Sequence, residues 1–345
     1  MKIVKLSEVC EVLDSKRIPV TANNRKKGIY PYYGANGIQD YVSDYIFDDE
    51  LVLLAEDGGN FGSKDKPIAY RVSGKCWVNN HAHVLKPRDN INVDYLCDAL
   101  KFYDVTNIIN GATRKKLTQA AMLGMQIPLP DLDKQNKISL ELKTCTTIIE
   151  KHRKLISKYD TLIKSRFIEM FGDPKINSSN LPTKKFIEVV KLQRGFDLPV
   201  QERNQDGLFN VYGSNGPLDK HDSFKVKAPG IVTGRSGTLG NVYYVLEDYW
   251  PLNTTLFSVD IHNNNVVYLK YLLELYDLSR FSEGAGVPTL NRNIVHDKDI
   301  IDVPLSLQND FATFVQQIDK SKFAIQKSLE KAETLYKSLM QEYFG

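Results

Sequence analysis

The sequence has no long apolar run, few cysteines and almost no excess of either charge. No stretch of about 18 consecutive apolar residues occurs, so we expect no transmembrane helix and no membrane partner. The first residues, MKIVKLSEVCEVL, lack the continuous apolar segment of a signal peptide. Cys10, Cys76, Cys97 and Cys145 form no CxxC pair, which argues against structural zinc. Scattered thiols of this kind are typical of a reducing compartment, so we expect a cytoplasmic protein.

The small net charge limits how this chain can bind nucleic acid. Its 45 Lys and Arg residues are nearly balanced by 42 Asp and Glu residues, which leaves a formal charge of +3. A protein that holds DNA alone through electrostatics carries a strongly basic surface. If the chain reads DNA, we therefore expect partner subunits to neutralise many of the phosphates. Its 345 residues are enough for about two domains.

An internal repeat divides the chain into two halves. Residues 165–172 (SRFIEMFG) return 173 residues later as residues 338–345 (SLMQEYFG). Further matches occur in the same order: 33–37 with 212–216, Trp77 and Asn80 with Trp250 and Asn253, Gly111-Ala112 and Leu117 with Gly284-Ala285 and Leu290, and Gln135-Asn136 with Gln308-Asn309. The offset is 179 residues for the first of these and 173 for the others. A drifting offset indicates two copies of one domain with small loop insertions.

Each half ends in a heptad pattern without proline or glycine, which predicts long helices over residues 132–172 and 306–345. Each would be roughly 55–60 Å long at 1.5 Å per residue. Two such helices favour an antiparallel coiled coil, and the alternative is two amphipathic helices packed on their own modules. The apolar positions define the predicted seam, which is imperfect at Cys145, His152, Arg166 and Lys322. Its members are Ile138, Leu142, Ile149, Ile156 and Ile163 in the first helix and Phe311, Val315, Ile318, Ile325, Leu329 and Tyr336 in the second.

The regions before these helices, residues 1–131 and 173–305, predict compact α+β modules. Short β-rich runs such as 51–54 and 230–232 alternate with Gly, Asn and Asp turns. Short helices are expected around 93–105 and 267–278. The fold class is therefore α+β, with two pseudo-repeated α/β modules, each followed by a long helix.

The motifs of the first half occur in a distinctive order. They are YYGANGI (32–38), LLAEDGGN (53–60), WVNNHAHVL (77–85), GATRKKL (111–117) and IPLP (127–130), followed by the heptad helix. This set resembles the specificity subunit of type I restriction–modification systems, and the resemblance covers essentially the whole chain. The second half departs from the set, since GRSG (234–237) replaces EDGG (56–59), and this divergence fits two modules that read different half-sites.

The resemblance implies a non-catalytic reader of double-stranded DNA. The modules 1–131 and 173–305 would be target recognition domains, each reading one half of a bipartite site. The paired helices would set the gap. Such a subunit assembles with two methyltransferase subunits, which methylate adenine, and with endonuclease–translocase subunits. S-adenosylmethionine, ATP and Mg would then be bound by the partners, and this chain would need no cofactor.

Candidate DNA contacts in the first half lie in the motif loops. Arg114, Lys115 and Lys116 form its densest basic cluster and follow Gly111, which lets a backbone approach DNA closely; a solvated turn is the alternative. Asparagine pairs bidentately with adenine, so Asn36, Asn60 and Asn80 are candidates, although Asn-Gly is also ordinary turn chemistry.

Candidates in the second half follow the repeat. They are Asn215, Arg235, Ser236, Asn253, Asn291 and Arg292. Arg235, between Gly234 and Gly237, is suited to reading guanine or holding a phosphate. The sequence VPT (287–289) stands where the first half has a basic cluster, so residue-by-residue equivalence is in doubt there.

Enzyme patterns are weak. His81 and His83 would share a strand face, but no further ligands occur at a recognisable spacing. Pro130-Asp131 with Glu141-Leu-Lys143 mimics a nuclease motif, yet Leu142 belongs to the predicted seam. The Asn/Asp-Pro-Pro-Tyr motif of adenine methyltransferases and the Walker GxxxxGK[ST] motif are both absent. Two alternatives to the specificity subunit remain: a coiled-coil scaffold without sequence-specific DNA binding, and a stand-alone DNA-acting enzyme.

Overall fold

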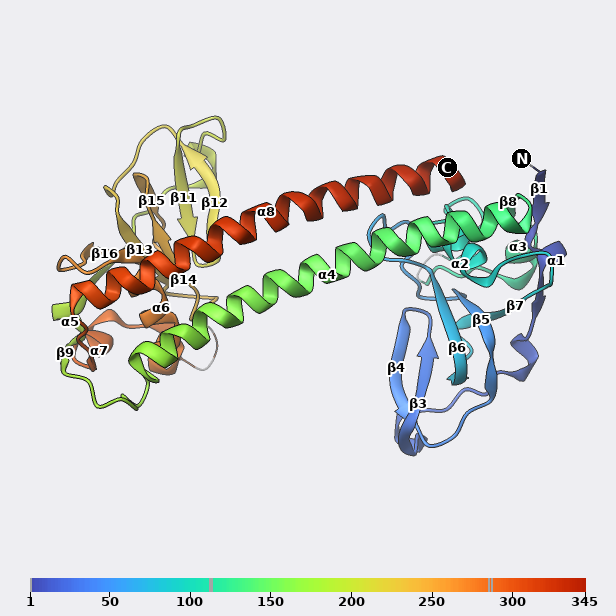
Figure 1. Cartoon of the computed structure of the whole chain (residues 1–345), viewed down its shortest axis with the longest axis horizontal. Coiled ribbons are helices and arrows are strands. Elements are labelled where there is room, and N and C mark those ends of the chain that lie inside the picture. The colour runs from blue at the N-terminus through green and yellow to red at the C-terminus, as the bar shows by residue number, and fades with distance from the viewer. Residues whose placement is uncertain (1, 112–113, 285, 287) are drawn as a thin grey trace. The chain divides into compact units, whose positions relative to one another are not determined.

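The chain forms two compact units, which the computed structural model describes over residues 2–111, 114–284, 286 and 288–345 (Figure 1). Unit 1 comprises Met1–Lys151 and Leu329–Gly345, and unit 2 comprises His152–Ser328. Two long helices, α4 (Leu132–Phe171) and α8 (Leu305–Phe344), are each divided between the units. Four members of the predicted loop motifs lie outside the described residues: Ala112, Thr113, Ala285 and Val287.

Unit 1 is built on a mixed six-stranded sheet with the order β2-β7-β5-β6-β3-β4. Its strands are β1 (Lys2–Lys5), β2 (Cys10–Val12), β3 (Lys27–Gly34), β4 (Gly37–Val42), β5 (Phe47–Ala55), β6 (Ala69–Val78), β7 (Ala82–Pro87) and β8 (Gln126–Leu129). Its short helices are α1 (Leu6–Val9), η1 (Asp14–Lys16), η2 (Ala22–Asn24), α2 (Val93–Lys101) and α3 (Gln119–Leu123). Strands β1 and β8 form a separate antiparallel pair, and α2 packs on β5 and β6.

Unit 2 divides its strands among smaller sheets, with the orders β10-β16-β13-β14, β12-β11-β15, β19-β9 and β17-β18. The strands are β9 (Thr183–Lys185), β10 (Lys191–Arg194), β11 (Phe209–Gly213), β12 (Gly216–His221), β13 (Gly230–Gly234), β14 (Val242–Val245), β15 (Tyr249–Pro251), β16 (Thr255–Asp260), β17 (Ser282–Glu283), β18 (Thr289–Leu290) and β19 (Asp299–Ile301). The short helices are α5 (Phe186–Val189), η3 (Val200–Glu202), α6 (Val266–Tyr276), η4 (Leu278–Phe281) and α7 (Arg292–His296).

The two units share one topology, which confirms the predicted α+β class and the internal repeat. The order β2-β7-β5 of unit 1 corresponds to β10-β16-β13 of unit 2, and β4-β3-β6 corresponds to β12-β11-β15. The long strand β6 of unit 1 belongs to both groups, whereas in unit 2 it is replaced by β14 and β15. The register agrees as well, because Tyr32 pairs with Trp77 in parallel and Val211 pairs with Trp250 in the same way.

A buried glutamine joins each module to its long helix. Gln135 of α4 is 0% exposed, and its Oε1 accepts a hydrogen bond from the backbone N–H of Asn92 at 2.8 Å. Its Nε2 donates to the carbonyl oxygen of Pro130 at 2.8 Å. Asn92 also caps α2, since its side chain accepts from the N–H groups of Asp94 and Tyr95. One amide therefore connects the start of α2 to the start of α4.

The same joint occurs in unit 2 with matching distances. Gln308 of α8 is 1% exposed, accepts from the N–H of Asn265 at 2.8 Å and donates to the carbonyl oxygen of Val303 at 2.7 Å. Asn265 caps α6 through its side chain, as Asn92 caps α2. The Gln-Asn repeat seen in the sequence is therefore the joint between module and helix.

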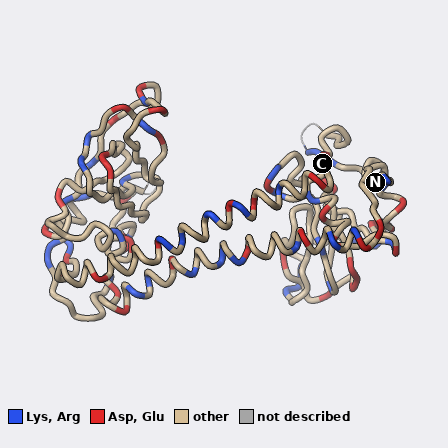
Figure 2. Tube along the Cα trace, turned by 45° about the horizontal axis from the view of Figure 1, so that its top comes forward, with Lys and Arg blue, Asp and Glu red and all other residues tan. Residues whose placement is uncertain are grey.

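The first turns of the predicted seam are buried against the modules rather than between the helices alone. Ile138 and Leu142 belong to the core of unit 1, and Phe311 and Val315 belong to the core of unit 2. At its beginning, each long helix thus packs on its own module. This was the alternative to a coiled coil considered for the sequence. Basic and acidic residues are interspersed along both helices (Figure 2), in agreement with the small net charge.

The end of α4 departs from the heptad series, which passes through Arg166 and Met170. The buried residues are instead Phe167 and Phe171, at 0% and 1% exposure, and Arg166 pairs with Glu169 at the surface. A straight helix with 3.6 residues per turn drifts away from a 3.5-residue repeat, so the buried stripe shifts by one position where α4 packs on α6.

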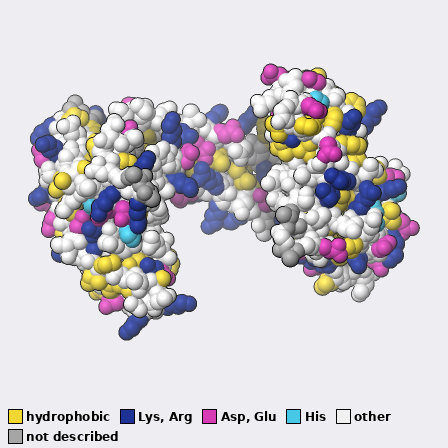
Figure 3. Space-filling model, turned by 180° about the vertical axis from the view of Figure 1, so that it is seen from behind, with side chains coloured by type: hydrophobic (Ala, Val, Ile, Leu, Met, Phe, Trp, Pro, Cys, Tyr) yellow, Lys and Arg dark blue, Asp and Glu magenta, His cyan; other side chains and the backbone are white. Residues whose placement is uncertain are grey.

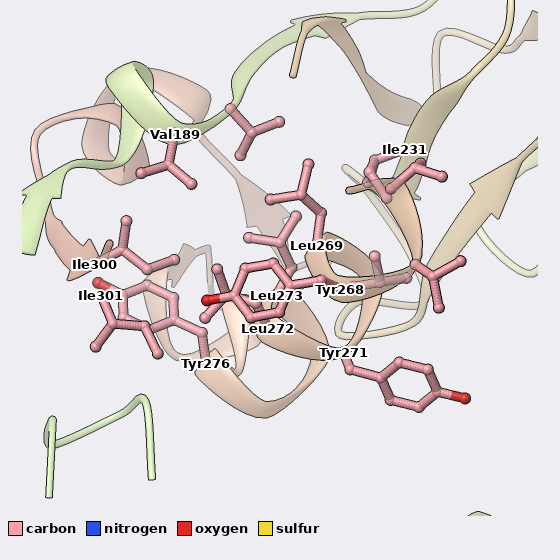
Figure 4. Close-up of a cluster of buried hydrophobic side chains, with 14 of the residues drawn as sticks. Val189, Ile231, Tyr268, Leu269, Tyr271, Leu272, Leu273, Tyr276, Ile300 and Ile301 are labelled. Atoms are coloured by element: carbon pink, nitrogen blue, oxygen red, sulfur yellow. The ribbon is translucent and has the colours of Figure 1, made fainter. Parts of the chain in front are cut away.

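The core of unit 2 is centred on α6. Leu269, Leu272 and Leu273 lie among side chains from α5, β13 and β19, including Ile231 and Ile300 (Figure 4).

The mean hydropathy of the whole chain is −0.33, and no described helix has the length and apolarity needed to cross a bilayer. All four cysteines are buried free thiols, and burial raises the pKa of Cys10, Cys76 and Cys97 to about 12.

Replacing either joint glutamine should destabilise its own unit. Gln135→Ala and Gln308→Ala each leave a buried N–H and a buried carbonyl unpaired, at a cost of about 1–3 kcal/mol per group. We expect each variant to lower the urea midpoint of unfolding by circular dichroism. The control is Gln316→Ala, which removes the same amide from an exposed position of α8; equal midpoints for all three variants would show that the joints contribute nothing.

Candidate nucleic-acid interface

In unit 1 the motif loops that were singled out in the sequence meet at one place. The loop after β5 carries Glu56 and Asp57, and the N–H of Leu117 donates to the carbonyl oxygen of Glu56 at 2.7 Å. Asn36, in the turn between β3 and β4, donates from Nδ2 to the carbonyl oxygen of Gly58 at 3.0 Å. Basic, acidic and histidine side chains lie together on the face of unit 1 seen in Figure 3.

The guanidinium of Arg114 is held by a carboxylate that the sequence did not point to. Arg114 Nη2 lies 2.8 Å from Asp57 Oδ1, and His81 Nδ1 lies 2.6 Å from the same oxygen. Arg114 is nevertheless mostly exposed, with 59% of its side chain accessible. The contact therefore orients the guanidinium without burying it. His81, considered above only as a metal ligand, belongs to this cluster.

Lys116 forms an ion pair with Glu56, the residue before Asp57. Its Nζ lies 2.8 Å from Glu56 Oε1, and Arg17 Nη1 lies 2.6 Å from Glu56 Oε2. Burial raises the pKa of Glu56, but hydrogen bonds from Lys116 and Arg17 outweigh it and hold the pKa below its ordinary value. Glu56 is therefore ionised at neutral pH, and its carboxylate forms ion pairs with both Lys116 and Arg17.

His83 is a buried structural residue. Its Nδ1 lies 2.6 Å from Asp14 Oδ2, and its Nε2 lies 2.9 Å from the carbonyl oxygen of Leu117. Asp14, Glu56 and His83 have the spacing of a metal-binding set. However, Arg17 and Lys116 already neutralise the two carboxylates, and a cation would have to displace both. The donor set does not fit a resident metal.

The remaining candidates of unit 1 differ in accessibility. Lys115 is exposed, and its side chain makes no hydrogen bond or ion pair with any described residue, so it is the cation of this cluster left available to a phosphate. Asn80 is also exposed. Asn60 donates to the carbonyl oxygen of Pro67 at 3.3 Å within its own loop. Asn79, its amide bonded to Gln39, is 3% exposed.

The structure brings several candidates of unit 2 together through backbone contacts between their loops. Asn215 is exposed at the β11–β12 turn. Arg235 follows β13, and its Nε donates to the carbonyl oxygen of Asn253 at 2.9 Å. The Asn253 side chain donates to Asp197. Ser236 bridges to Thr289 through the backbone.

The last two candidates of unit 2 begin a helix. The side chain of Asn291 caps α7 by accepting from the N–H of Asn293 at 3.0 Å, and Arg292 is the first residue of that helix. Thr118 caps α3 at the corresponding place in unit 1. Asn291 is therefore a helix N-cap. The sequence did not reveal this role, because the group that Asn291 bonds is a backbone N–H.

The alignment of GRSG with EDGG is wrong by one residue. The N–H of Leu290 donates to the carbonyl oxygen of Arg235 at 2.7 Å, just as Leu117 donates to Glu56. Arg235 therefore corresponds to Glu56, not to Asp57, and Ser236 corresponds to Asp57. The offset is 179 residues, the same as between 33–37 and 212–216, so Gly237 corresponds to Gly58 and Gly234 to Ala55.

The nuclease-like pattern is not assembled. Glu141 and Lys143 lie within α4 rather than on strands, and Glu141 accepts a hydrogen bond from the Tyr343 hydroxyl at 2.6 Å. Its carboxylate is therefore engaged in contact between α4 and α8.

Comparison with known proteins now identifies the family. The model of the type I restriction modification DNA specificity domain matches residues 1–158 and again residues 179–334. The chain belongs to this family. The two matches correspond to the two halves of the internal repeat, so each module with most of its long helix is one copy of the family domain.

Individual relatives agree with this assignment. A Haemophilus influenzae protein assigned as a type I restriction enzyme specificity subunit is 27% identical over 95% of this chain and 90% of its own length. The specificity subunit of the Escherichia coli type I restriction enzyme EcoprrI is 23% identical over 40% of this chain and 29% of its own length.

Solved structures support the fold. The type I restriction-modification S subunit from M. genitalium superposes with a TM-score of 0.65 at 15% identity, covering 100% of this chain and 96% of the other. A chain from a structural study of complex assembly in a type I R-M system gives 0.57 at 15% identity, covering 99% and 97%.

Lys115→Ala should weaken DNA binding by the assembled complex equally for all sequences. Loss of one phosphate contact lowers the slope of log affinity against log salt by about one unit. Fluorescence anisotropy across a salt series measures it. Lys2→Ala, which removes an exposed lysine from β1, is the control. An unchanged slope for Lys115→Ala would exclude a phosphate contact.

Proposed function

We propose that the chain supplies the DNA sequence specificity of a type I restriction–modification complex. It would read a bipartite target in double-stranded DNA, with residues 1–131 and 173–305 acting as target recognition domains for one half-site each. The observation that carries this proposal is the repeated topology, in which two copies of one module bear different side chains at the same loops. Two divergent readers on one chain fit an asymmetric, two-part site.

We further propose that the helices over 132–172 and 306–345 pair as an antiparallel coiled coil that fixes the distance between the half-sites. Contacts within unit 2 support pairing: the Phe167 and Phe311 rings lie 5.3 Å apart, and Lys322 Nζ lies 2.5 Å from Asp160 Oδ1. Since residues late in α4 meet residues early in α8, the directions are opposite.

The ends of both helices support the same arrangement. The Phe171 ring of α4 packs against Tyr268 of α6 at 5.3 Å in unit 2. The Phe344 ring of α8 packs against Tyr95 of α2 at 5.2 Å in unit 1. Each helix therefore starts on its own module and ends on the other. A helical pair is stiff enough to act as a ruler, whereas a flexible linker would leave the gap undefined.

Catalysis in this proposal belongs to the partners. The chain would assemble with two methyltransferase subunits and with endonuclease–translocase subunits in the cytoplasm. S-adenosylmethionine, ATP and Mg would be bound by those subunits. The near-balanced charge of the chain favours such sharing, since partners would then supply phosphate contacts. The family match and the relatives do not support the two alternatives considered for the sequence, a stand-alone enzyme and a scaffold without DNA recognition.

Sequencing of host DNA for methyladenine, with and without this gene, tests the reading role. We expect a two-part methylated motif that disappears on deletion. A methylation pattern unchanged by deletion would contradict the proposal. Methylation by the isolated chain would indicate an enzyme instead.

Changing the length of the helices tests the ruler. Inserting or deleting the same four residues, about one turn, in both α4 and α8 should change the gap between the half-sites while leaving the half-site bases unchanged. Methylation mapping reads both quantities. Altered half-site bases with a constant gap would refute the ruler.

A further inference from the structure

Two arginines lie at the same end of the four-stranded sheet of unit 2. Arg194 is the last residue of β10, and Arg235 directly follows β13, with β16 between these strands. Arg194 pairs with Leu256 of β16, and Gly234 pairs with the adjacent Thr255. Two strand spacings are about 10 Å, a separation that two arginine side chains can bridge.

Neither guanidinium is neutralised by a carboxylate in the part of unit 2 that the structure describes. Arg194 is exposed, and Arg235 donates from Nε to a backbone carbonyl. The nearby carboxylate of Asp197 accepts from Asn253 instead. Burial, and then the charge of Arg194, lower the pKa of Arg235, so the two cations are near enough to repel each other.

The position of Arg235 is occupied by an acid in unit 1. The N–H of Arg235 donates to the carbonyl oxygen of Thr254 at 2.8 Å, and the N–H of Glu56 donates to that of His81 at 2.9 Å. Together with the matched bonds from Leu290 and Leu117, this places Arg235 and Glu56 at one point of the shared fold.

The position of Arg194 is likewise an acid in unit 1. Leu192 pairs with Ser258, and Val12 pairs with Leu85 at the corresponding place. Arg194 and Asp14 each follow two residues later.

Two neighbours of these carboxylates are replaced by residues without a positive charge in unit 2. Strand register and bridges place Leu256 where unit 1 has His83, and Thr289 where it has Lys116. A balanced cluster in unit 1 is thus replaced by two cations in unit 2.

We propose that Arg194 and Arg235 form an anion site that binds a backbone phosphate of the half-site read by unit 2. Guanidinium groups bind phosphate oxygens through paired N–H donors, and the anion relieves the repulsion between the two cations. This inference rests on the proposed function. It also implies that the two modules bind the DNA backbone through different residues. At the corresponding positions of unit 1, acidic side chains form ion pairs with Arg17 and Lys116.

The test uses the chain assembled with its methyltransferase partners. Arg194→Gln and Arg235→Gln, singly and together, are compared with wild type for affinity across a salt series. We expect weaker binding in each, and a slope at least about one unit shallower in the double variant. The loss should be the same for cognate and mismatched duplexes, because phosphates carry no sequence information.

Two further variants make the result specific. Arg194→Lys keeps the charge and should retain the wild-type slope. Lys227→Gln removes an exposed cation elsewhere in unit 2 and should leave the slope unchanged. A wild-type slope in the double variant, or an equal loss in either control, would overturn the anion site.

Methylation mapping separates the remaining outcomes. Relaxed choice of bases in one half-site of the double variant would mean base reading and would also overturn it. A two-part wild-type motif establishes the proposed function independently of these arginines, so failure of the anion site is distinguishable from failure of that function.

Discussion

The buried glutamine at the base of each long helix is the contact on which the architecture depends. Gln135 and Gln308 bond to the N–H that begins a module helix and to a carbonyl just before the long helix. An unpaired amide at either buried position would be costly, so the helix can leave its module in one direction only. Any distance that the helices fix between two readers rests on these rigid exits.

Much of the architecture was predictable because repeats and heptads are local patterns. The observed helices begin and end within one residue of the ranges 132–172 and 306–345. The heptad pattern did not predict the burial of Phe167 and Phe171, which lie one position beyond the heptad series. Their burial depends on α6, more than ninety residues away in sequence, and no periodicity within α4 contains that information.

The candidate interface was predictable in its loops but not in its electrostatics. Arg114, Lys115 and Lys116 look alike as a run of cations, yet only Lys115 lacks an ion pair with a described residue. The difference arises from Glu56 and Asp57, which reach the run through strand pairing across some sixty residues. In unit 2 a one-residue shift hid the charge reversal at Arg235, which only backbone hydrogen bonds revealed.

The division of α8 between the units bears on how the chain folds as it is made. Tyr336, Leu339, Met340, Tyr343 and Phe344 cover the core of unit 1, although they are synthesised after the whole of the second module. The module of residues 1–131 is therefore completed only after residues 173–305 have been made, and until then it exposes apolar surface of the kind that chaperones and proteases recognise. A chain truncated before α8 keeps that apolar surface exposed, which marks it for degradation.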